Sequence, residues 1–149
     1  MNGIYVVIAE VSRAVSIPIG KRRKNYFKKG FYCYVGSALR GLEKRMARHC
    51  SKEKKLHWHI DYFLVIAKIR SLIYAKTTRK VECALSRILS RKLDSIRQFG
   101  CSDCTCKSHL FFAQDFDRLV KVVKNSYHLL DLQPIKYEGL PSSIRYINS

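Results

Sequence analysis

The stretch FYCYVGSALRGLEKRMARH, residues 31–49, changes its pattern at a glycine-serine pair. Aromatic and β-branched residues run up to that pair, which is typical of a strand. After it, Leu42 and Met46 stand four residues apart with basic residues between them, as on a short amphipathic helix. The stretch therefore predicts a strand at 31–38 and a helix at 41–50. Such a unit can serve packing alone, or it can hold a phosphate.

The segments before this unit supply a second strand and an excursion. GIYVVIAEV (3–11) is apolar on both faces and β-branched, which predicts a buried central strand. An antiparallel pair of 3–11 with 31–38 is the simplest arrangement. Residues 12–30 are interrupted by Pro18 and Gly20 and carry a dense basic run, so we expect a hairpin-like excursion with an exposed basic tip.

The remainder of the chain alternates between strand and helix patterns. We expect strands at 67–75 and 109–114, helices at 56–66, at 78–93 and after a cap at Asp115 or Asp117, and an irregular tail at 134–149. Periodicity alone leaves 56–66 open between a helix, which we favour, and a buried apolar stretch. The order predicts an α+β fold, with a small central, mainly antiparallel sheet of about three to four strands flanked by helices. We expect residues 1–149 to form a single domain.

The charge balance points to a polyanionic partner. Lys and Arg number 29 against 11 Asp and Glu, a formal net charge of +18. In a small domain such an excess is most often matched by nucleic acid, and an anionic membrane surface is the weaker alternative. No apolar run is long enough to cross a bilayer and no signal-peptide pattern is present, so we expect a cytoplasmic protein without a membrane partner.

Two short motifs resemble those of a nuclease superfamily. GIY at 3–5 and YVG at 34–36 are similar to the two name-giving motifs of the GIY-YIG nucleases, in the same order and ahead of a basic helix. The blocks LHWHIDY (56–62) and GCSDCTCKSHLF (100–111) resemble a small, archaeal-type branch, whose members also occur joined to DNA-repair glycosylases. The resemblance implies a metal-dependent endonuclease that acts on DNA, or on RNA, in repair or processing, with a repair glycosylase as a partner.

The resemblance also implies site residues. Arg45 would bind the scissile phosphate, Tyr5 or Tyr34 would help to activate water, His49 would act in catalysis or contact phosphate, and Glu82 would bind the metal. Arg45 and His49 are four residues apart and so share a helix face. On residue chemistry alone the tyrosines could be ordinary sheet residues. A tyrosine is a poor base unless a cation lowers its pKa, and arginines on the helix could do so.

The scarcity of acidic residues limits the metal site. A two-metal site needs several carboxylates, and the chain offers Glu82, with Asp61 as a second candidate. One Mg²⁺ or Mn²⁺ held by water, Glu82 and phosphate fits better. Alternatively, Glu82 is a boundary residue that pairs with a lysine.

Basic and aromatic segments are candidates for substrate contact. On a helix, His57 and Asp61 would share a face, which would let Asp61 orient His57 or His49, whereas on a strand His57, His59 and Asp61 would suggest a metal site. Trp58 is expected in the core. The candidate substrate-binding residues are Arg48, His57, Lys21, Arg22, Arg23 and Lys24.

Three cysteines crowd one loop. Cys101, Cys104 and Cys106, followed by His109, offer ligands that zinc accepts, although nine residues leave little chain to wrap an ion. A disulfide is the rival reading. We favour a disulfide or free thiols, and His109 can instead face the cleft. The other cysteines, Cys33, Cys50 and Cys83, are expected to be small core residues.

One departure from the superfamily favours a different function. GIY-YIG nucleases commonly carry an asparagine near the end of the domain, and after Glu82 this chain has only Asn125 and Asn148. Ser108 or His109 could substitute. The alternative is a non-catalytic nucleic-acid-binding module on the same fold, and a weaker one is a basic structural protein of an RNA assembly.

Overall fold

The computed structural model describes residues 2–19, 24–97, 99–100 and 106–140. The strands within these ranges are β1 (Gly3–Val11), β2 (Val15–Pro18), β3 (Lys24–Phe27), β4 (Gly30–Ala38), β5 (Lys68–Lys76), β6 (Asp94–Ser95), β7 (Leu110–Ala113) and β8 (Ile135–Lys136). The helices are α1 (Leu42–Cys50), α2 (His59–Ile66), α3 (Glu82–Ser90) and α4 (Phe116–Leu129).

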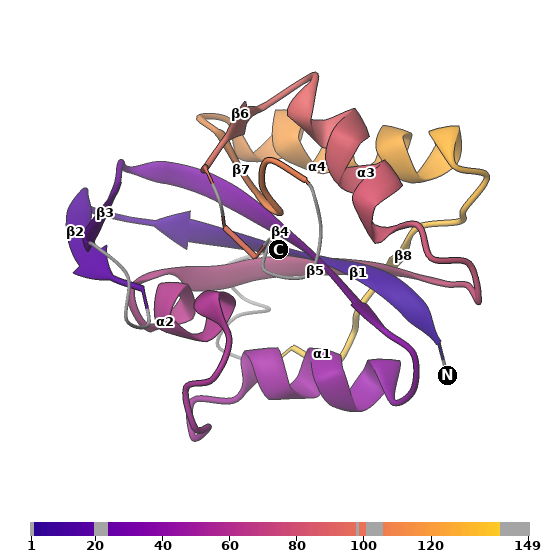
Figure 1. The fold of residues 1–149 in the computed structure, drawn as a ribbon, viewed down its shortest axis with the longest axis horizontal. Coiled ribbons are helices and arrows are strands. Elements are labelled where there is room, and N and C mark those ends of the chain that lie inside the picture. Colours follow the sequence, from indigo (N-terminus) through magenta and orange to yellow (C-terminus); the bar gives the residue numbers. More distant parts are fainter. Residues whose placement is uncertain (1, 20–23, 98, 101–105, 141–149) are drawn as a thin grey trace.

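The central sheet is antiparallel and has β1 near its middle. Its order is β6-β7-β4-β1-β5-β8, and β2 with β3 forms a separate two-stranded hairpin (Figure 1). The predicted α+β class and the antiparallel pairing of the first two long strands are confirmed. The predicted strand number was too low, because β6 and β8 have two residues each and carry no readable alternation. In the described part of the tail predicted to be irregular, only Ile135–Lys136 forms a strand, β8, and residues 137–140 form neither helix nor strand.

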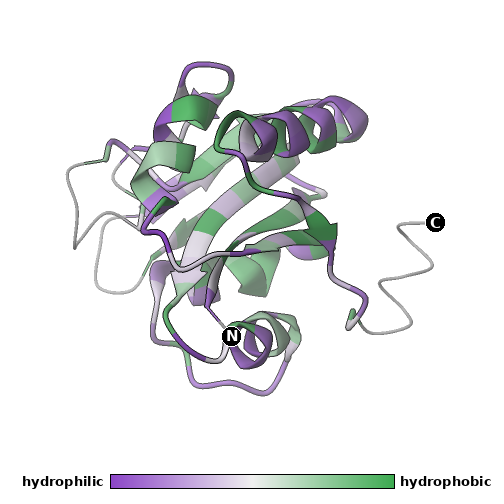
Figure 2. Ribbon diagram, turned by 90° about the vertical axis from the view of Figure 1, so that its right-hand side faces the viewer, coloured by the Kyte–Doolittle hydropathy of each residue, from purple (hydrophilic) through white to green (hydrophobic). Residues whose placement is uncertain are grey.

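The helices cover both faces of the sheet. In Figure 1, α3 and α4 lie on one face and α1 and α2 on the other. Ile4, Val6 and Ile8 of β1 pack in the core cluster with α3 and α4, whereas Tyr5 and Val7 pack in the cluster with α1. This explains why β1 is apolar at consecutive positions: both of its faces are buried. Figure 2 shows that hydrophobic strands lie between helices whose outer turns are hydrophilic.

Predicted helix boundaries differ from the observed ones. α3 begins at Glu82 and ends at Ser90, inside the predicted 78–93, and α2 begins at His59, so that His57 precedes the helix. The prediction of a helix at 41–50 is confirmed by α1, and Asp115 caps α4 by accepting a hydrogen bond from the Arg118 N–H. No helix in the described part of the chain is both long and apolar enough to span a membrane.

The glycines of the two motifs allow close approaches around β1. Gly36 pairs with Tyr5, and a Cβ atom at residue 36 would overlap with the Tyr5 ring and hydroxyl. A Cβ atom at Gly3 would overlap with the Leu42 side chain of α1 and with the Ala75 carbonyl. Gly36 therefore lets the Tyr5 ring contact the backbone of β4, and Gly3 lets α1 approach β1.

Replacement of Gly36 by alanine is expected to destabilise the fold by about 1–3 kcal/mol, because the new methyl group must displace the buried Tyr5 ring. Urea denaturation of the variant would measure the free energy of unfolding. Ser37→Ala, at the next and half-exposed position of β4, is the matched control. A Gly36→Ala variant as stable as this control would contradict the packing argument.

Candidate functional site

A pocket of about 860 Å³ is lined by four of the five sequence-predicted catalytic residues and by His57, one of the predicted substrate-binding residues. It is lined by Tyr5 of β1, Tyr34 of β4, Arg45 of α1, His57 and Glu82, the first residue of α3. Glu82 and Arg45 thus come from helices on opposite faces of the sheet (Figure 1). His49 and Arg48 are adjacent to this group but are not among the residues that line the pocket.

The two tyrosines lie on the same face of the sheet. Val7 is paired with Tyr34, and Tyr5 lies two residues from Val7 along β1, so both tyrosine side chains point to the α1 side. Tyr5 is 2% exposed and Tyr34 is half-buried. Because Tyr5 and Tyr34 are diagonal neighbours across the strand pair, their rings reach one end of the same pocket.

His49 lies behind Tyr5 and holds its hydroxyl. The distance from Tyr5 Oη to His49 Nε2 is 2.7 Å, and His49 is 2% exposed. Burial, followed by the positive charge of Lys54, lowers the pKa of His49 to about 3. The imidazole is therefore neutral at pH 7, and its Nε2 can accept the Tyr5 proton when Nδ1 carries the ring hydrogen.

The tyrosine acidities differ from the sequence-based interpretation. Burial raises the pKa of both Tyr5 and Tyr34 above the usual value, and the nearby Arg45 opposes this effect without overcoming it. Both side chains are therefore neutral phenols at pH 7. The idea that helix cations lower these pKa values underestimated the desolvation that α1 imposes by covering the sheet.

Arg45 and Arg48 stack on Trp58 but differ in their other contacts. Their guanidinium carbons lie 4.5 and 4.3 Å from the indole centroid. Arg48 also forms a two-point ion pair with Asp61, with both N···O distances at 2.9 Å. Arg45 Nη1 donates to the Ser37 carbonyl at 3.3 Å, a long hydrogen bond. Arg45 is thus the arginine of α1 that lines the pocket and can turn its donors to a ligand.

Trp58 packs against the core cluster beside α2, in line with the sequence-based expectation, and it also lines the pocket beside Arg45. Its ring is half-buried and its face is covered by the two guanidinium groups. Cation–π contacts of this kind hold the arginines in place. The aromatic residue between two histidines was the available signal, but its partners on α1 were not visible in the local sequence.

Asp61 organises the start of α2. Its side chain is fully buried and accepts hydrogen bonds from Arg48 and from the backbone N–H groups of His57 and Trp58. Burial raises the pKa of Asp61, but the hydrogen bonds from Arg48, Trp58 and His57 outweigh it and leave the pKa below its usual value. Asp61 therefore orients Arg48 and not the ring of His49 or His57. Both of its oxygens are already hydrogen-bonded, so the sequence-based suggestion that Asp61 is a second metal ligand is not supported.

Glu82 stands at the N-terminus of α3 beside His109. Its side chain is 34% exposed, and Oε1 lies 3.6 Å from Nδ1 of His109, which is itself buried. His109 lines the pocket, which agrees with the suggestion from the sequence that it faces a cleft. Glu82 and His109 therefore form the wall opposite Arg45.

A group of metal-ligand residues adjoins this wall. Cys83, Cys106 and His109 offer ligand atoms that lie within 4.8 Å of one another and could hold a metal ion. Cys83, predicted as a small core residue, lines the pocket instead. Cys101 and Cys104 lie outside the described residues, as do Lys21, Arg22 and Arg23.

Other pocket residues were missed from the sequence. The segment Thr77 to Lys80 lines the pocket between β5 and α3, and Asn2 lines it before β1. Two hydroxyls and two cations in TTRK, directly before a helix, were a readable signal of a polar wall. Lys24 lies on β3 and is exposed.

Most of the chain matches the model of one known family. Residues 4–132 match the family described as Domain of unknown function DUF123. The match runs from β1 to the segment that follows α4. No curated protein and no solved structure matches the chain. The family description names no activity, so the chemistry must be argued from the pocket.

Proposed function

We propose that this chain, which belongs to the DUF123 family, is a metal-dependent endonuclease of the GIY-YIG type that hydrolyses DNA phosphodiester bonds in repair or processing. The observation that supports this most is the meeting of Tyr5, Tyr34, Arg45 and Glu82 in one pocket. Phosphodiester hydrolysis needs a cation on the phosphate, a group that accepts a proton from the attacking water and, in most cases, a metal. These side chains offer all three kinds of contact.

Arg45 is assigned to the scissile phosphate. Its planar guanidinium can bind two phosphate oxygens at once, which a lysine cannot do. The stacking on Trp58 restricts its orientation, and its long hydrogen bond to Ser37 is readily exchanged for a phosphate contact. Arg45 would thus neutralise charge on the phosphate in both the ground state and the transition state.

We assign to Tyr5 and His49 the removal of a proton from the attacking water. The Tyr5 hydroxyl takes the water proton while its own proton passes to His49 Nε2, 2.7 Å away. The hydroxide attacks phosphorus, and the leaving oxygen is protonated from solvent. In the free protein burial disfavours an imidazolium at His49, but the negative charge of a bound phosphate would favour it. The pair is therefore expected to work only with substrate in the pocket.

Glu82 is assigned to the metal. It is the acidic side chain that lines the pocket within the described residues, and a single carboxylate suits Mg²⁺ or Mn²⁺, which keep several waters and bind substrate phosphate. When bound, such an ion would neutralise charge developing on the phosphate. Glu82 would hold it on the side of the pocket opposite Arg45.

The basic surface is assigned to the DNA backbone. The net charge of +18 favours phosphate contacts that do not depend on base sequence. Lys24 on the hairpin and His57 at the pocket are the described members of the proposed substrate-binding set that remain available, since Arg48 is bound by Asp61. We propose that the protein acts on DNA in the cytoplasm and that a repair glycosylase is its partner.

A second candidate is a nucleic-acid-binding module without catalysis. Asn125 is exposed on α4 and Asn148 lies outside the described residues, so within the described chain neither supplies the superfamily's asparagine to the pocket. Asn2 and Thr77 line the same pocket as Glu82. The candidates differ in turnover, not in binding.

Cleavage of DNA by the highly purified, untagged protein tests the proposal. With Mg²⁺ or Mn²⁺ we expect nicking or linearisation of plasmid or branched DNA, and with EDTA we expect none. Gel assays at several salt concentrations would measure the extent of cleavage. Fluorescence anisotropy at the same salt concentrations would measure the affinity for DNA. Strong, salt-sensitive binding with no metal-dependent cleavage would overturn the nuclease and favour the binding module.

A further inference from the structure

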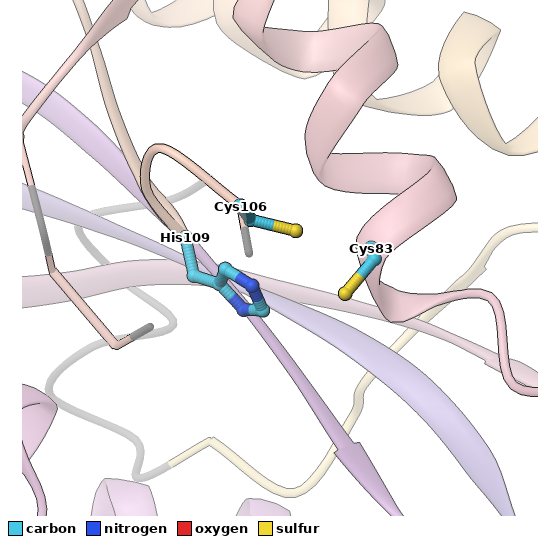
Figure 3. Close-up of side chains that lie close together, drawn as sticks. All are labelled: Cys83, Cys106 and His109. Atoms are coloured by element: carbon cyan, nitrogen blue, oxygen red, sulfur yellow. The ribbon is translucent and has the colours of Figure 1, made fainter. Parts of the chain in front are cut away.

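Three soft or borderline metal ligands converge from separate parts of the chain. Cys83 lies in the first turn of α3, Cys106 lies in the segment before β7, and His109 directly precedes β7. Figure 3 shows the thiols of Cys83 and Cys106 pointing toward one another, with the imidazole of His109 beside them. All three ligand atoms lie within 4.8 Å of one another.

We propose that Cys83, Cys106 and His109 form a zinc site, with two thiolates and one imidazole as ligands. Binding replaces the two thiol protons with bonds to the metal and releases these protons to solvent. This site is chemically distinct from the proposed Mg²⁺ position, because hard cations select oxygen ligands and sulfur selects zinc or similar soft cations. Zinc binding at these residues does not require nuclease activity.

The geometry is within reach of tetrahedral coordination. With Zn–S bonds of about 2.3 Å and Zn–N bonds of about 2.0–2.1 Å, tetrahedral ligand atoms stand roughly 3.5–3.8 Å apart. The observed 4.8 Å limit therefore requires a contraction of about 1.0–1.3 Å at most, which side-chain rotation of the two cysteines can supply. Cys83 and His109 line the pocket, so water can reach a fourth coordination position.

Local electrostatics and rigidity both favour the site. Cys83 is the second residue of α3, where the helix dipole stabilises a thiolate. The backbone of His109 is fixed, since its N–H donates to the Phe99 carbonyl at 2.8 Å and its carbonyl accepts from the Val35 N–H at 2.9 Å. Two of the three ligands therefore stand on rigid elements, and the metal would tie the segment at Cys106 to α3.

The site differs from the one suggested by sequence spacing. The local run offers Cys101, Cys104 and Cys106 with His109 as possible zinc ligands, although the sequence favours a disulfide or free thiols there. The structure instead brings in Cys83 from a distant helix. Cys83 is therefore the residue whose substitution separates the two possibilities. Cys50, a half-buried cysteine of α1 outside this group, provides the matched control.

Metal analysis of the full-length, untagged and reduced protein tests the proposal. We expect about one zinc ion per chain in Cys50→Ser, as in the original protein, and near zero in Cys83→Ser. Titration with Co²⁺ should give the thiolate charge-transfer and tetrahedral d–d bands in Cys50→Ser but not in Cys83→Ser. Far-UV circular dichroism would establish that both variants are folded, and His109→Ala provides a second ligand variant.

Several results would overturn the site. Cys83→Ser that keeps full zinc would assign the ion to the local cysteine run, and a Cys83–Cys106 disulfide found by mass spectrometry after rapid alkylation would replace the ion by a covalent bond. Absence of both zinc and the Co²⁺ bands in the reduced protein would also exclude it. Because each readout is metal content or spectrum, failure of the zinc site is distinguishable from failure of DNA cleavage.

Discussion

Replacement of Arg45 by alanine is expected to reduce the rate of DNA cleavage by about 10²–10³-fold, because it removes the pocket cation assigned to the scissile phosphate. Glu82→Ala is expected to give a comparable loss from the opposite wall, by removing the carboxylate assigned to the metal. Single-turnover cleavage with saturating Mg²⁺ would measure both effects. Such an experiment separates chemistry from product release.

The choice of controls makes this prediction specific. Lys44 is the exposed neighbour of Arg45 on α1, so Lys44→Ala removes the same charge without entering the pocket and should cleave at nearly the original rate. Arg45→Lys should recover only part of the rate, because an ammonium group cannot bind two phosphate oxygens in the same way. If Arg45→Ala and Glu82→Ala both cleave as fast as Lys44→Ala, the assigned site is wrong.

The fold was predictable where long segments carry their own pattern. Residues 3–11 and 31–38 are uniformly strand-like. The apolar residues of α4 recur with helical spacing, so this helix could be predicted without knowing what it packs against. The start of α2 was less predictable, because Asp61 binds the backbone N–H groups of two preceding residues and the helix begins only at His59. Strands of two residues depend on the neighbour that they extend, which a local pattern does not contain.

The site was predictable only in part for the same reason. Gly36 of the second motif marks a close contact with Tyr5 within the strand pair, but the register that places Tyr5 and Tyr34 on one face is not contained in either motif. The direction of their pKa shifts depends on burial under α1, a tertiary property. The meeting of Cys83 with Cys106 likewise depends on how α3 packs beside the segment before β7, and the nearby cysteines in sequence obscured it.

His49 is expected to make the protein lose stability from about pH 6.5 downward, so that the loss begins above the range in which carboxylates titrate. Burial lowers the pKa of His49 from 6.5 to about 3 in the folded state, so between these values the unfolded chain binds a proton that the folded chain does not. The stabilising contribution of neutral His49 is therefore complete above pH 6.5 and declines as the pH falls toward 3. The decline is at most about 1.4 kcal/mol per pH unit.

The surroundings of His49 give the physical reason for this shift. Its Nε2 is hydrogen-bonded to Tyr5, and its buried Nδ1 has no hydrogen-bond partner among the residues that the structure describes. Protonation would thus create a buried imidazolium whose Nδ1–H group has no acceptor among these residues, next to the positive charges of Lys54, Arg48 and Arg45. The charge of Asp61 acts in the opposite direction but is already paired with Arg48.

Free energies of unfolding in urea, measured from pH 7.5 to pH 4, would test the prediction. In His49→Gln the extra loss of stability below pH 6.5 should disappear, because glutamine does not titrate, even if the variant is less stable at neutral pH. His128→Gln, at an exposed position of α4, should keep the slope of the original protein. Equal slopes in all three proteins would mean that His49 is protonated without penalty in the folded state, and the neutral acceptor assigned to the Tyr5 hydroxyl would have to be abandoned.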